Sequence, residues 1–171
     1  MNIRKSETQD LDILVELYRD AFPDEDLIPL VRQLLADRPD VLSLVSHNDP
    51  EISGNIIFTF CEIRTSKEKV ALLGPLAVDP VHQKKGIGSN LVREGIEQIA
   101  AMGVSRVFVL GDPNYYSRFG FIPERSIEPP YDIPQEWQDA WQSICNEDSA
   151  ARPKSRLLVP EPWQSRSLWA F

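Results

Sequence analysis

The sequence predicts an α+β domain built on a central, twisted and mostly antiparallel sheet, with one parallel strand pair and flanking helices. Apolar runs at residues 41–46, 52–64 and 70–78 are separated only by turn residues, which is typical of an antiparallel meander. The stretch 70–110 then reads as strand, loop, amphipathic helix and strand, a β-α-β unit whose two strands run parallel. Two amphipathic helical patterns precede the meander.

The N-terminal elements follow from apolar spacing. Residues 2–5 form a short strand, and a helix after Thr8 presents one apolar stripe and ends at Pro23. A second, shorter helix spans residues 26–37 and stops before Arg38 and Pro39. The stripe of the first helix comprises Leu11, Leu14, Val15, Tyr18 and Phe22.

The period of the apolar residues changes after Gly88, where a helix begins that Gly103 closes. Residues 104–110 are nearly all apolar, as buried parallel strands are. A tight turn then leads into a short helix over residues 114–119, and Phe121 begins an extended segment. Together these elements complete the core of the predicted domain, residues 2–127.

Residues 128–171 are rich in proline and contain all four tryptophans of the chain. We expect a short helix over 134–145, with Trp137 and Trp141 on one face, and a strand over 156–159. The apolar tail 168–171 is expected to dock on the body of the protein. We treat the chain as one domain, 1–171, whose C-terminal part diverges from any common pattern.

Composition limits the functional classes. The formal net charge of −8 disfavours binding to nucleic acid, which requires Lys and Arg against phosphates. Cys61 and Cys145 form neither a disulfide framework nor a zinc motif, so no metal site is predicted. The N-terminus lacks the apolar core of a secretory signal, and no apolar run approaches a membrane span. These features predict a cytoplasmic protein with no membrane association.

The turn between the strand at 70–78 and the next helix carries the most specific chemistry. Gly86 and Gly88 let a ligand approach the backbone closely, and amide groups at a helix N-terminus attract anions. Lys84 and Lys85 add positive charge, so the turn predicts a pyrophosphate site. A dinucleotide fold would have Gly or Ala where Leu91 stands, and a P-loop would have Gly-Lys-Ser/Thr, so neither nucleotide fold fits well.

Two motifs in this order resemble the GNAT superfamily of acetyl-CoA-dependent N-acetyltransferases. The first is Gln83-x-x-Gly86-x-Gly88, which follows a strand. The second is Tyr116, four residues before the pair Gly120-Phe121. The resemblance covers about residues 2–127 and is closest to small bacterial members. It implies a sheet whose two parallel strands splay apart near a bulge, with the thioester of acetyl-CoA in the gap.

The resemblance also implies the residues that hold coenzyme A. Backbone amides of the turn 84–89 would bind the pyrophosphate, and the strand ending at Val78 would bind the pantetheine arm through backbone groups, with a bulge at Gly74-Pro75. Asn114 and Arg118 flank the second motif and would contact the cofactor, although Arg118 has the alternative of pairing with an acidic neighbour. The expected cofactor-binding residues are Leu76, Ala77, Val78, Gln83, Lys84, Lys85, Gly86, Ile87, Gly88, Ser89, Asn114 and Arg118.

The implied reaction is direct attack of a neutral amine on the thioester. Tyr116 would face the sulfur and donate a hydrogen bond to the departing thiolate, because a phenol of pKa about 10 is a weaker acid than a thiol of pKa about 8.5. Tyr115 is its rival for this role. Glu62 is the candidate base, since a charge is unexpected on its apolar strand, and a solvent-facing side chain is the other interpretation.

The leading hypothesis is therefore an N-acetyltransferase that modifies a primary amine of a small molecule or a protein. The alternative is a catalytically silent acyl-CoA-binding regulatory module, and a Rossmann-type oxidoreductase is a distant third. In the family the acceptor pocket is bordered by the first two helices and the C-terminal segment, here residues 22–30 and the region after 127. We expect a monomer or a homodimer.

Overall fold

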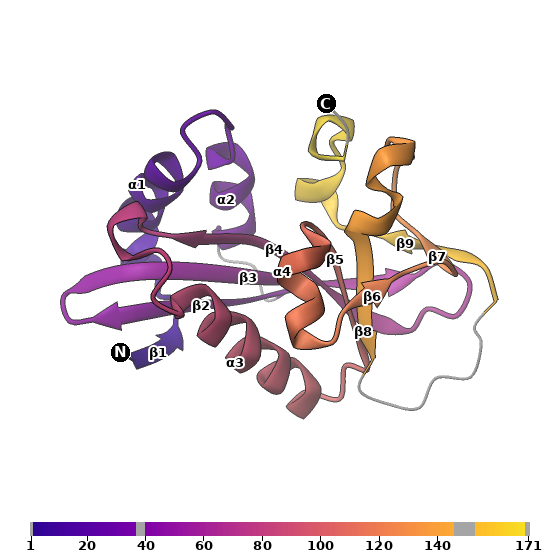
Figure 1. The fold of residues 1–171 in the computed structure, drawn as a ribbon, viewed down its shortest axis with the longest axis horizontal. Helices are drawn as coiled ribbons and strands as arrows, with labels where there is room; N and C mark the ends of the chain where they lie inside the picture. The colour runs from indigo at the N-terminus through magenta and orange to yellow at the C-terminus, as the bar shows by residue number, and fades with distance from the viewer. Residues whose placement is uncertain (1, 37–39, 146–152, 170–171) are drawn as a thin grey trace. The chain divides into compact units, whose positions relative to one another are not determined.

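The computed structural model describes residues 2–36, 40–145 and 153–169 (Figure 1). The chain forms two compact units. The first comprises Met1–Thr59 and Gly74–Gln98, and the second comprises Phe60–Leu73 and Ile99–Phe171. Strands β3 (Glu51–Ile63) and β4 (Lys69–Val78) each contribute residues to both units. The predicted mixture of a mostly antiparallel sheet, one parallel pair and helices is confirmed.

In the first unit, strands β1 (Asn2–Lys5) and β2 (Val41–Asn48) pair antiparallel, and β2 pairs antiparallel with β3. A register shift between Ser46 and His47 interrupts the second ladder. Strands β2 and β3 lie where the apolar runs predicted them, because each run is bounded by turn residues, and β1 occupies the predicted residues 2–5.

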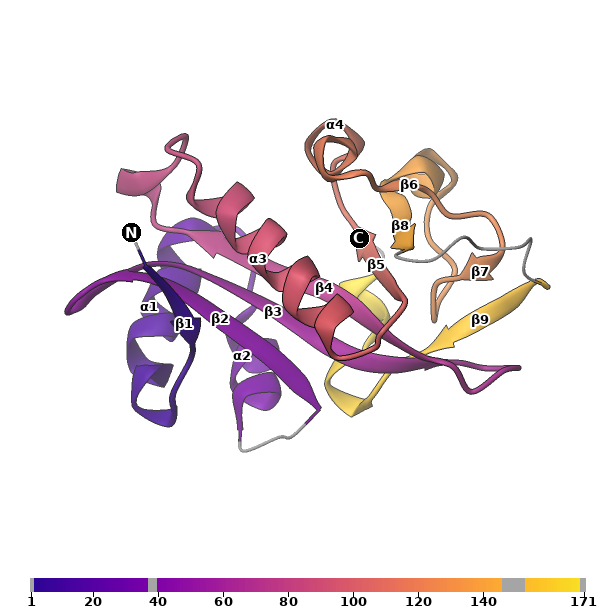
Figure 2. The same ribbon diagram turned by 90° about the horizontal axis from the view of Figure 1, so that it is seen from below.

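Helices α1 (Leu11–Ala21) and α2 (Ile28–Leu35) lie on one face of β1–β3, and α3 (Ile87–Ala101) lies on the other (Figure 2). The second helix is shorter than the predicted 26–37, and residue 37 lies outside the described residues. Burial of the apolar stripe of α1 against the sheet builds the core of this unit. Its buried cluster consists of Leu14, Leu17, Tyr18, Val31, Val45, Ile52 and Ala77.

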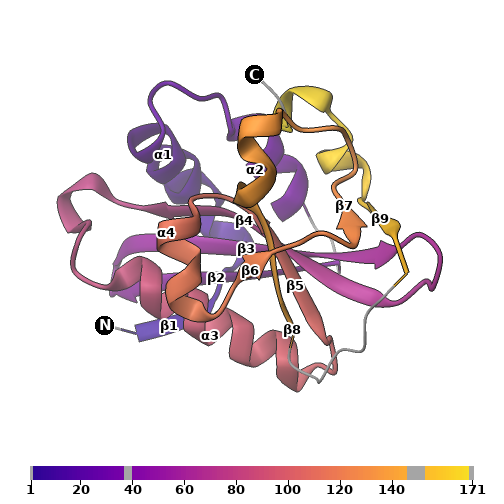
Figure 3. The ribbon, with the colours of Figure 1, turned by 45° about the vertical axis from the view of Figure 1, so that its right-hand side comes forward.

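In the second unit, β5 (Arg106–Leu110) pairs in parallel with the beginning of β4, and Leu72 lies opposite Phe108. Strand β8 (Trp141–Cys145) pairs antiparallel with β5 and with β6 (Ile122–Pro123). Figure 3 shows β8 beside β5, with the chain passing from β5 through α4 to β6. The parallel pair of the predicted β-α-β unit is confirmed.

The remaining strands of the second unit come from the C-terminal part. Strand β9 (Ser155–Leu158) pairs antiparallel with the end of β3, and Glu62 lies opposite Leu158. Strand β7 (Ile127–Glu128) pairs in parallel with β9. The predicted strand over 156–159 is thus confirmed one residue earlier.

The predicted helix over 134–145 is wrong in its second half. A 3-10 helix spans Gln135–Ala140, and Trp141 then begins β8. Pairing with β5 overrides the helical spacing of Trp137 and Trp141, because strand pairing brings the Trp141 ring to 5.4 Å from that of Phe108. Such a long-range partner is invisible to local spacing.

The predicted docking of the apolar tail is confirmed for Trp169, which is buried and lies 5.8 Å from Trp141 between ring centroids. Its indole N–H donates to the carbonyl of Trp163. Residues 170 and 171 of the tail lie outside the described residues. None of the helices in the described ranges is long and apolar enough to cross a bilayer.

Candidate active site

The loop after β4 is fastened to the end of that strand. The carboxylate of Asp79 accepts a hydrogen bond from the backbone N–H of Val81 at 3.0 Å, which starts the 3-10 helix Pro80–His82. The side-chain amide of Gln83 donates to the carbonyl of Val78 at 3.1 Å. The first contact is internal to the loop, and the second ties the loop to the last residue of β4.

The turn itself has the backbone that an anion cradle requires. Lys84 (φ 65°) and Gly86 (φ 85°) both adopt left-handed conformations, and α3 begins at Ile87. The amide of Asn90 donates to the carbonyl of Gly86 at 3.0 Å. The earlier amides lie in the first turn, where a helix provides no acceptor and carries a partial positive charge.

Space around Gly86 is open. A Cβ built on this residue would meet no atom within 4 Å, and the side chains of Lys84 and Lys85 are exposed. The turn therefore offers backbone amides and two ammonium groups to a ligand from solvent. This arrangement is suited to a phosphate or pyrophosphate.

A glycine on the neighbouring strand sets how closely α3 approaches the sheet. A Cβ at Gly54 of β3 would lie 2.9 Å from the side chains of both Ile87 and Leu91, and 3.2 Å from the carbonyl oxygen of Ala77. The first turn of α3 can lie this close to β3 only because Gly54 has no side chain. Gly54 therefore helps to position the phosphate turn, a role that the sequence analysis missed.

The predicted pantetheine strand lies directly before this loop. Ala77 is buried in the core of the first unit, whereas Leu76 and Val78 are half-buried. The side chain of Ala77 is therefore committed to packing, whereas the side chains of Leu76 and Val78 remain partly accessible.

The second motif lies on a short helix of the second unit, α4 (Pro113–Tyr116). The carboxylate of Asp112 caps α4 by accepting from the backbone N–H of Asn114 at 2.9 Å. The backbone N–H of Tyr116 donates to the carbonyl of Asp112 at 3.0 Å. The side chain of Asn114 is exposed, so it is accessible to a ligand at the start of the helix.

The ring of Tyr116 packs among other aromatic rings. Its ring packs edge-to-face against those of Phe121 and Tyr115, with centroids 5.6 Å and 5.0 Å away. Burial raises the pKa of the Tyr116 phenol well above its usual value of 10, and the charge of the neighbouring Tyr115 phenolate adds to the rise. The phenol is therefore held in its protonated form, which can donate a hydrogen bond.

Arg118 stacks on aromatic rings at the surface of this segment. Its guanidinium carbon lies 4.6 Å from the ring centroid of Tyr115, and its Nε donates to the Tyr115 carbonyl at 3.3 Å. The guanidinium is exposed, and the stacking orients it from one side. Together with Asn114 it makes this part of α4 polar toward solvent.

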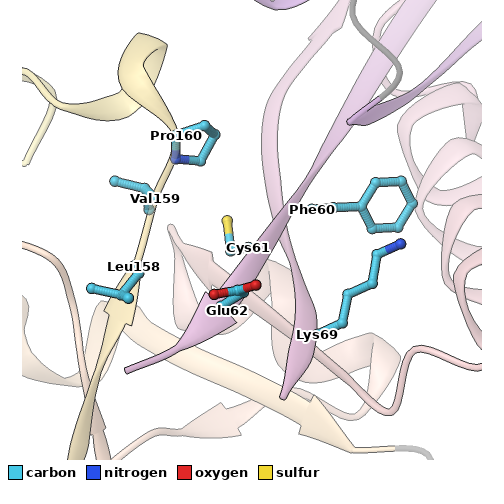
Figure 4. Close-up of a pocket in the computed structure, with 7 residues that line it drawn as sticks. All are labelled: Phe60, Cys61, Glu62, Lys69, Leu158, Val159 and Pro160. Atoms are coloured by element: carbon cyan, nitrogen blue, oxygen red, sulfur yellow. The ribbon is translucent and has the colours of Figure 1, made fainter. Parts of the chain in front are cut away.

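Glu62 lies in a different part of the second unit. Its side chain is exposed and lines an open cavity of about 520 Å³. Figure 4 shows Glu62 beside Leu158, with Lys69 next to the ring of Phe60 across the cavity. The Lys69 ammonium lies 4.5 Å from the centroid of that ring. The cavity is lined by Phe60, Cys61, Glu62, Lys69, Leu158, Val159 and Pro160, and Tyr116 is not among them.

Comparison with known proteins identifies the family of this fold. The model of the Acetyltransferase (GNAT) family matches residues 11–121, about two thirds of the chain. The chain belongs to the GNAT family. Among its relatives, the uncharacterised N-acetyltransferase YjhQ of Escherichia coli K12 is 37% identical over 142 residues, which cover 77% of this chain and 78% of YjhQ.

Two solved GNAT structures are similar over nearly the whole chain. YhbS of Escherichia coli, crystallised with CoA, has a TM-score of 0.86 and 26% identity, covering 96% of this chain and 92% of YhbS. A GNAT acetyltransferase of Brucella melitensis, crystallised with acetyl-CoA, has a TM-score of 0.77 and 27% identity, covering 95% and 97%. The similarity to these proteins thus includes the C-terminal part that the motif resemblance left out.

The two GNAT motifs occupy local structures that suit them. The phosphate turn and the end of β4 come together in the first unit, and Asn114, Tyr116 and Arg118 come together on and beside α4 in the second. No residue of α4 lines the 520 Å³ cavity that Glu62 borders. Gly54 was not predicted as a site residue, because only its closeness to Ile87 and Leu91, which are distant in sequence, reveals its role.

Proposed function

We propose that this protein transfers an acetyl group from acetyl-CoA to a primary amine of a small molecule or a protein. The phosphate turn at the start of α3 carries the proposal, since it provides the left-handed glycine, open space and exposed lysines that a pyrophosphate needs. Membership in the GNAT family supports it, as do the coenzyme complexes of YhbS and of the Brucella melitensis enzyme.

Coenzyme A would bind mainly through the first unit. We assign the pyrophosphate to the amides of residues 84–89, with Lys84 and Lys85 as mobile counter-charges and Gln83 as the tie that holds the loop to β4. The pantetheine arm would bond to backbone groups of residues 76–78. Asn114 and Arg118 keep the role of cofactor contacts that the family resemblance gives them.

The reaction forms a C–N bond and breaks the C–S bond of the thioester. The amine attacks in its neutral form, and the carbonyl oxygen becomes an oxyanion. The nitrogen then loses one proton, and the departing thiolate gains one, so the charges balance. We assign the hydrogen bond to the departing sulfur to Tyr116. Because burial raises the pKa of its phenol, Tyr116 donates without transferring its proton fully, an effect of about 10- to 100-fold in rate.

We assign to Glu62 the removal of the amine proton through water. Its exposed carboxylate in the open cavity is accessible to a cation, and the negative charge of the whole chain favours cationic acceptors. Glu62→Gln should lower kcat, whereas Glu136→Gln, an exposed control in the same unit, should leave kcat unchanged. Equal behaviour of the two variants removes Glu62 from the mechanism.

The activity is tested by incubating the protein with acetyl-CoA and a panel of amines while free thiol is measured. The panel should contain polyamines, amino acids, aminoglycosides and peptides with a free N-terminus or lysine. Release of thiol that depends on one amine, with the acetylated product found by mass spectrometry, supports the proposal. Release no faster than hydrolysis with every amine counts against it.

Among the described residues, no feature favours the silent regulatory module.

Tyr116→Phe separates the role of the phenol from cofactor binding. We expect kcat to fall about 10- to 100-fold with little change in acetyl-CoA affinity. Tyr131→Phe is the matched control, because this half-buried tyrosine lies in the same unit and is given no catalytic role. An unchanged kcat in Tyr116→Phe would remove Tyr116 from the mechanism while leaving the transfer activity itself in place.

A further inference from the structure

The residue that begins the turn after β5 is a glycine for a steric reason. A Cβ built on Gly111 would lie 2.5 Å from Cε2 and 3.1 Å from Cδ2 of Tyr116, and its third nearest atom is Cζ of the same ring at 3.6 Å. Real Cβ atoms do not approach carbon atoms at 2.5 Å. The Tyr116 ring therefore occupies the space that any other residue at position 111 would fill.

The backbone of Gly111 gives no separate reason for glycine. Four other glycines of the described chain have a positive φ, and Gly111 is not one of them. An alanine could adopt its backbone conformation without strain, so only the Tyr116 ring opposes a side chain there.

Gly111 is also held firmly from the other side. Its N–H donates to the carbonyl of Ala140 at 3.0 Å, and its carbonyl accepts from the side-chain amide of Gln142 at 3.1 Å. The same amide lies 3.3 Å from the carbonyl of Ala140. Gln142 is 1% exposed and lies opposite Val109 on the β5–β8 ladder, so it fastens the end of β5 to β8 at the level of Gly111.

We infer that Gly111 is a positioning residue for Tyr116: the Tyr116 ring packs against the bare backbone of Gly111, and Gln142 holds that backbone in place. The ring rests on Gly111 and is bordered by Phe121 and Tyr115, so the direction of the phenol O–H is set by packing. This inference rests on the proposed role of Tyr116. A proton donor must lie within hydrogen-bond reach of its acceptor, and an added methyl group would displace this one.

The test is a double-mutant cycle of Gly111→Ala with Tyr116→Phe. Gly111→Ala should lower kcat about 10-fold or more while the KM for acetyl-CoA stays near wild type. In the Tyr116→Phe background the same substitution should have almost no further effect, because the displaced ring no longer carries the phenol. A merely structural role would instead lower activity equally in both backgrounds.

Gly103→Ala provides the stability control. Gly103 has φ 80° and no atom within 4 Å of a built Cβ, so an alanine there strains the backbone of the same unit without touching a ring. Its effect on kcat should be small and independent of the Tyr116→Phe background. If Gly111→Ala does not fold, Gln142→Met replaces it in the cycle, because it removes the donor to Gly111 while keeping a similar side-chain length.

The outcomes distinguish the inference from the proposed function. Suppose that Tyr116→Phe lowers kcat, while Gly111→Ala either leaves kcat unchanged or lowers it equally in both backgrounds. The positioning role of Gly111 is then refuted and the role of Tyr116 stands. If Tyr116→Phe leaves kcat unchanged, the proposed role of Tyr116 is refuted, and the positioning of its ring by Gly111 has no effect on catalysis. Loss of kcat in Gly111→Ala that disappears in the Tyr116→Phe background supports both.

Discussion

The phenol of Tyr18 on α1 donates a hydrogen bond of 2.7 Å to the side-chain oxygen of Asn55 on β3, and both residues are fully buried. The same phenol lies 3.3 Å from the carbonyl of Pro75 on β4. The amide nitrogen of Asn55 donates in turn to Ser43 Oγ and to the carbonyl of Leu44 on β2. One polar pair thus connects α1, β2, β3 and the part of β4 that leads to the candidate cofactor site.

Removing the phenol of this pair should destabilise the fold. Tyr18→Phe leaves the Asn55 oxygen buried without its donor, which costs about 1–3 kcal/mol. Urea unfolding measures the loss, with Tyr131→Phe as the control that should change the free energy of unfolding by less than about 0.5 kcal/mol. Equal stability of the two variants would show that the buried pair contributes nothing net.

Gly54→Ala tests the approach of α3 to the sheet. The new methyl group would press on Ile87 and Leu91, so we expect a loss of about 1–3 kcal/mol in stability and an outward shift of the first turn of α3. Acetyl-CoA should bind more weakly, while kcat at saturating acetyl-CoA stays near wild type.

The matched control for Gly54→Ala lies further along the same helix. A Cβ at Gly95 would overlap the Phe58 ring, so Gly95→Ala also overpacks the interface between α3 and β3. It should cost stability without weakening acetyl-CoA binding, since it leaves the first turn in place. An equal loss of affinity in both variants would mean that general destabilisation, and not the position of the turn, is responsible.

Acid should weaken the N-terminal unit through Asp10. The hydrogen bond from Arg4, at 2.8 Å, holds the pKa of the Asp10 carboxyl below its usual value, although burial opposes the shift. A lowered pKa stabilises the folded state above the unfolded value of about 3.9, and this stability is lost as the pH falls through the folded pKa. The free energy of unfolding of the wild type should therefore converge on that of Asp10→Asn as the pH falls below about 4.

The value of kcat at alkaline pH should show that the Tyr116 phenol stays protonated. Its phenol works in the protonated form, and burial raises its pKa above 10, so kcat should show no loss from this group up to about pH 10. The measurement is the pH profile of kcat at saturating substrates for the wild type and Tyr116→Phe. An alkaline limb with an apparent pKa below 10 that disappears in Tyr116→Phe would contradict the enclosed phenol.

Local patterns predicted most of the fold. The strands from β1 to β5 and the helices α1 and α3 follow from apolar periodicity and from turn residues that lie next to them in sequence. Strand β8 was missed because its identity depends on pairing with β5, whose paired residues lie 31 to 39 positions earlier, and Trp141 had a spacing that suits a helix equally well.

The site divides in the same way. The phosphate turn could be predicted because its glycines and lysines are consecutive, and the left-handed φ of Gly86 is a local property. The packing of Tyr116 on Gly111 could not be predicted. Gly111 precedes Asp112-Pro113, so a turn already explained why a glycine is there. Asn55 gave an available signal, since it is a polar residue within the apolar strand β3, but its partner Tyr18 lies 37 positions away.

The most direct test of the account is the affinity for acetyl-CoA of Gly86→Asp against Gly86→Asn. Both side chains have nearly the same size and tolerate a left-handed backbone, so the pair differs in one negative charge beside the turn. Isothermal titration should show Gly86→Asp binding more weakly than Gly86→Asn by about 1–4 kcal/mol, the repulsion expected between a carboxylate and a phosphate a few ångströms apart. Equal affinity of the two variants would contradict a pyrophosphate bound at the N-terminus of α3.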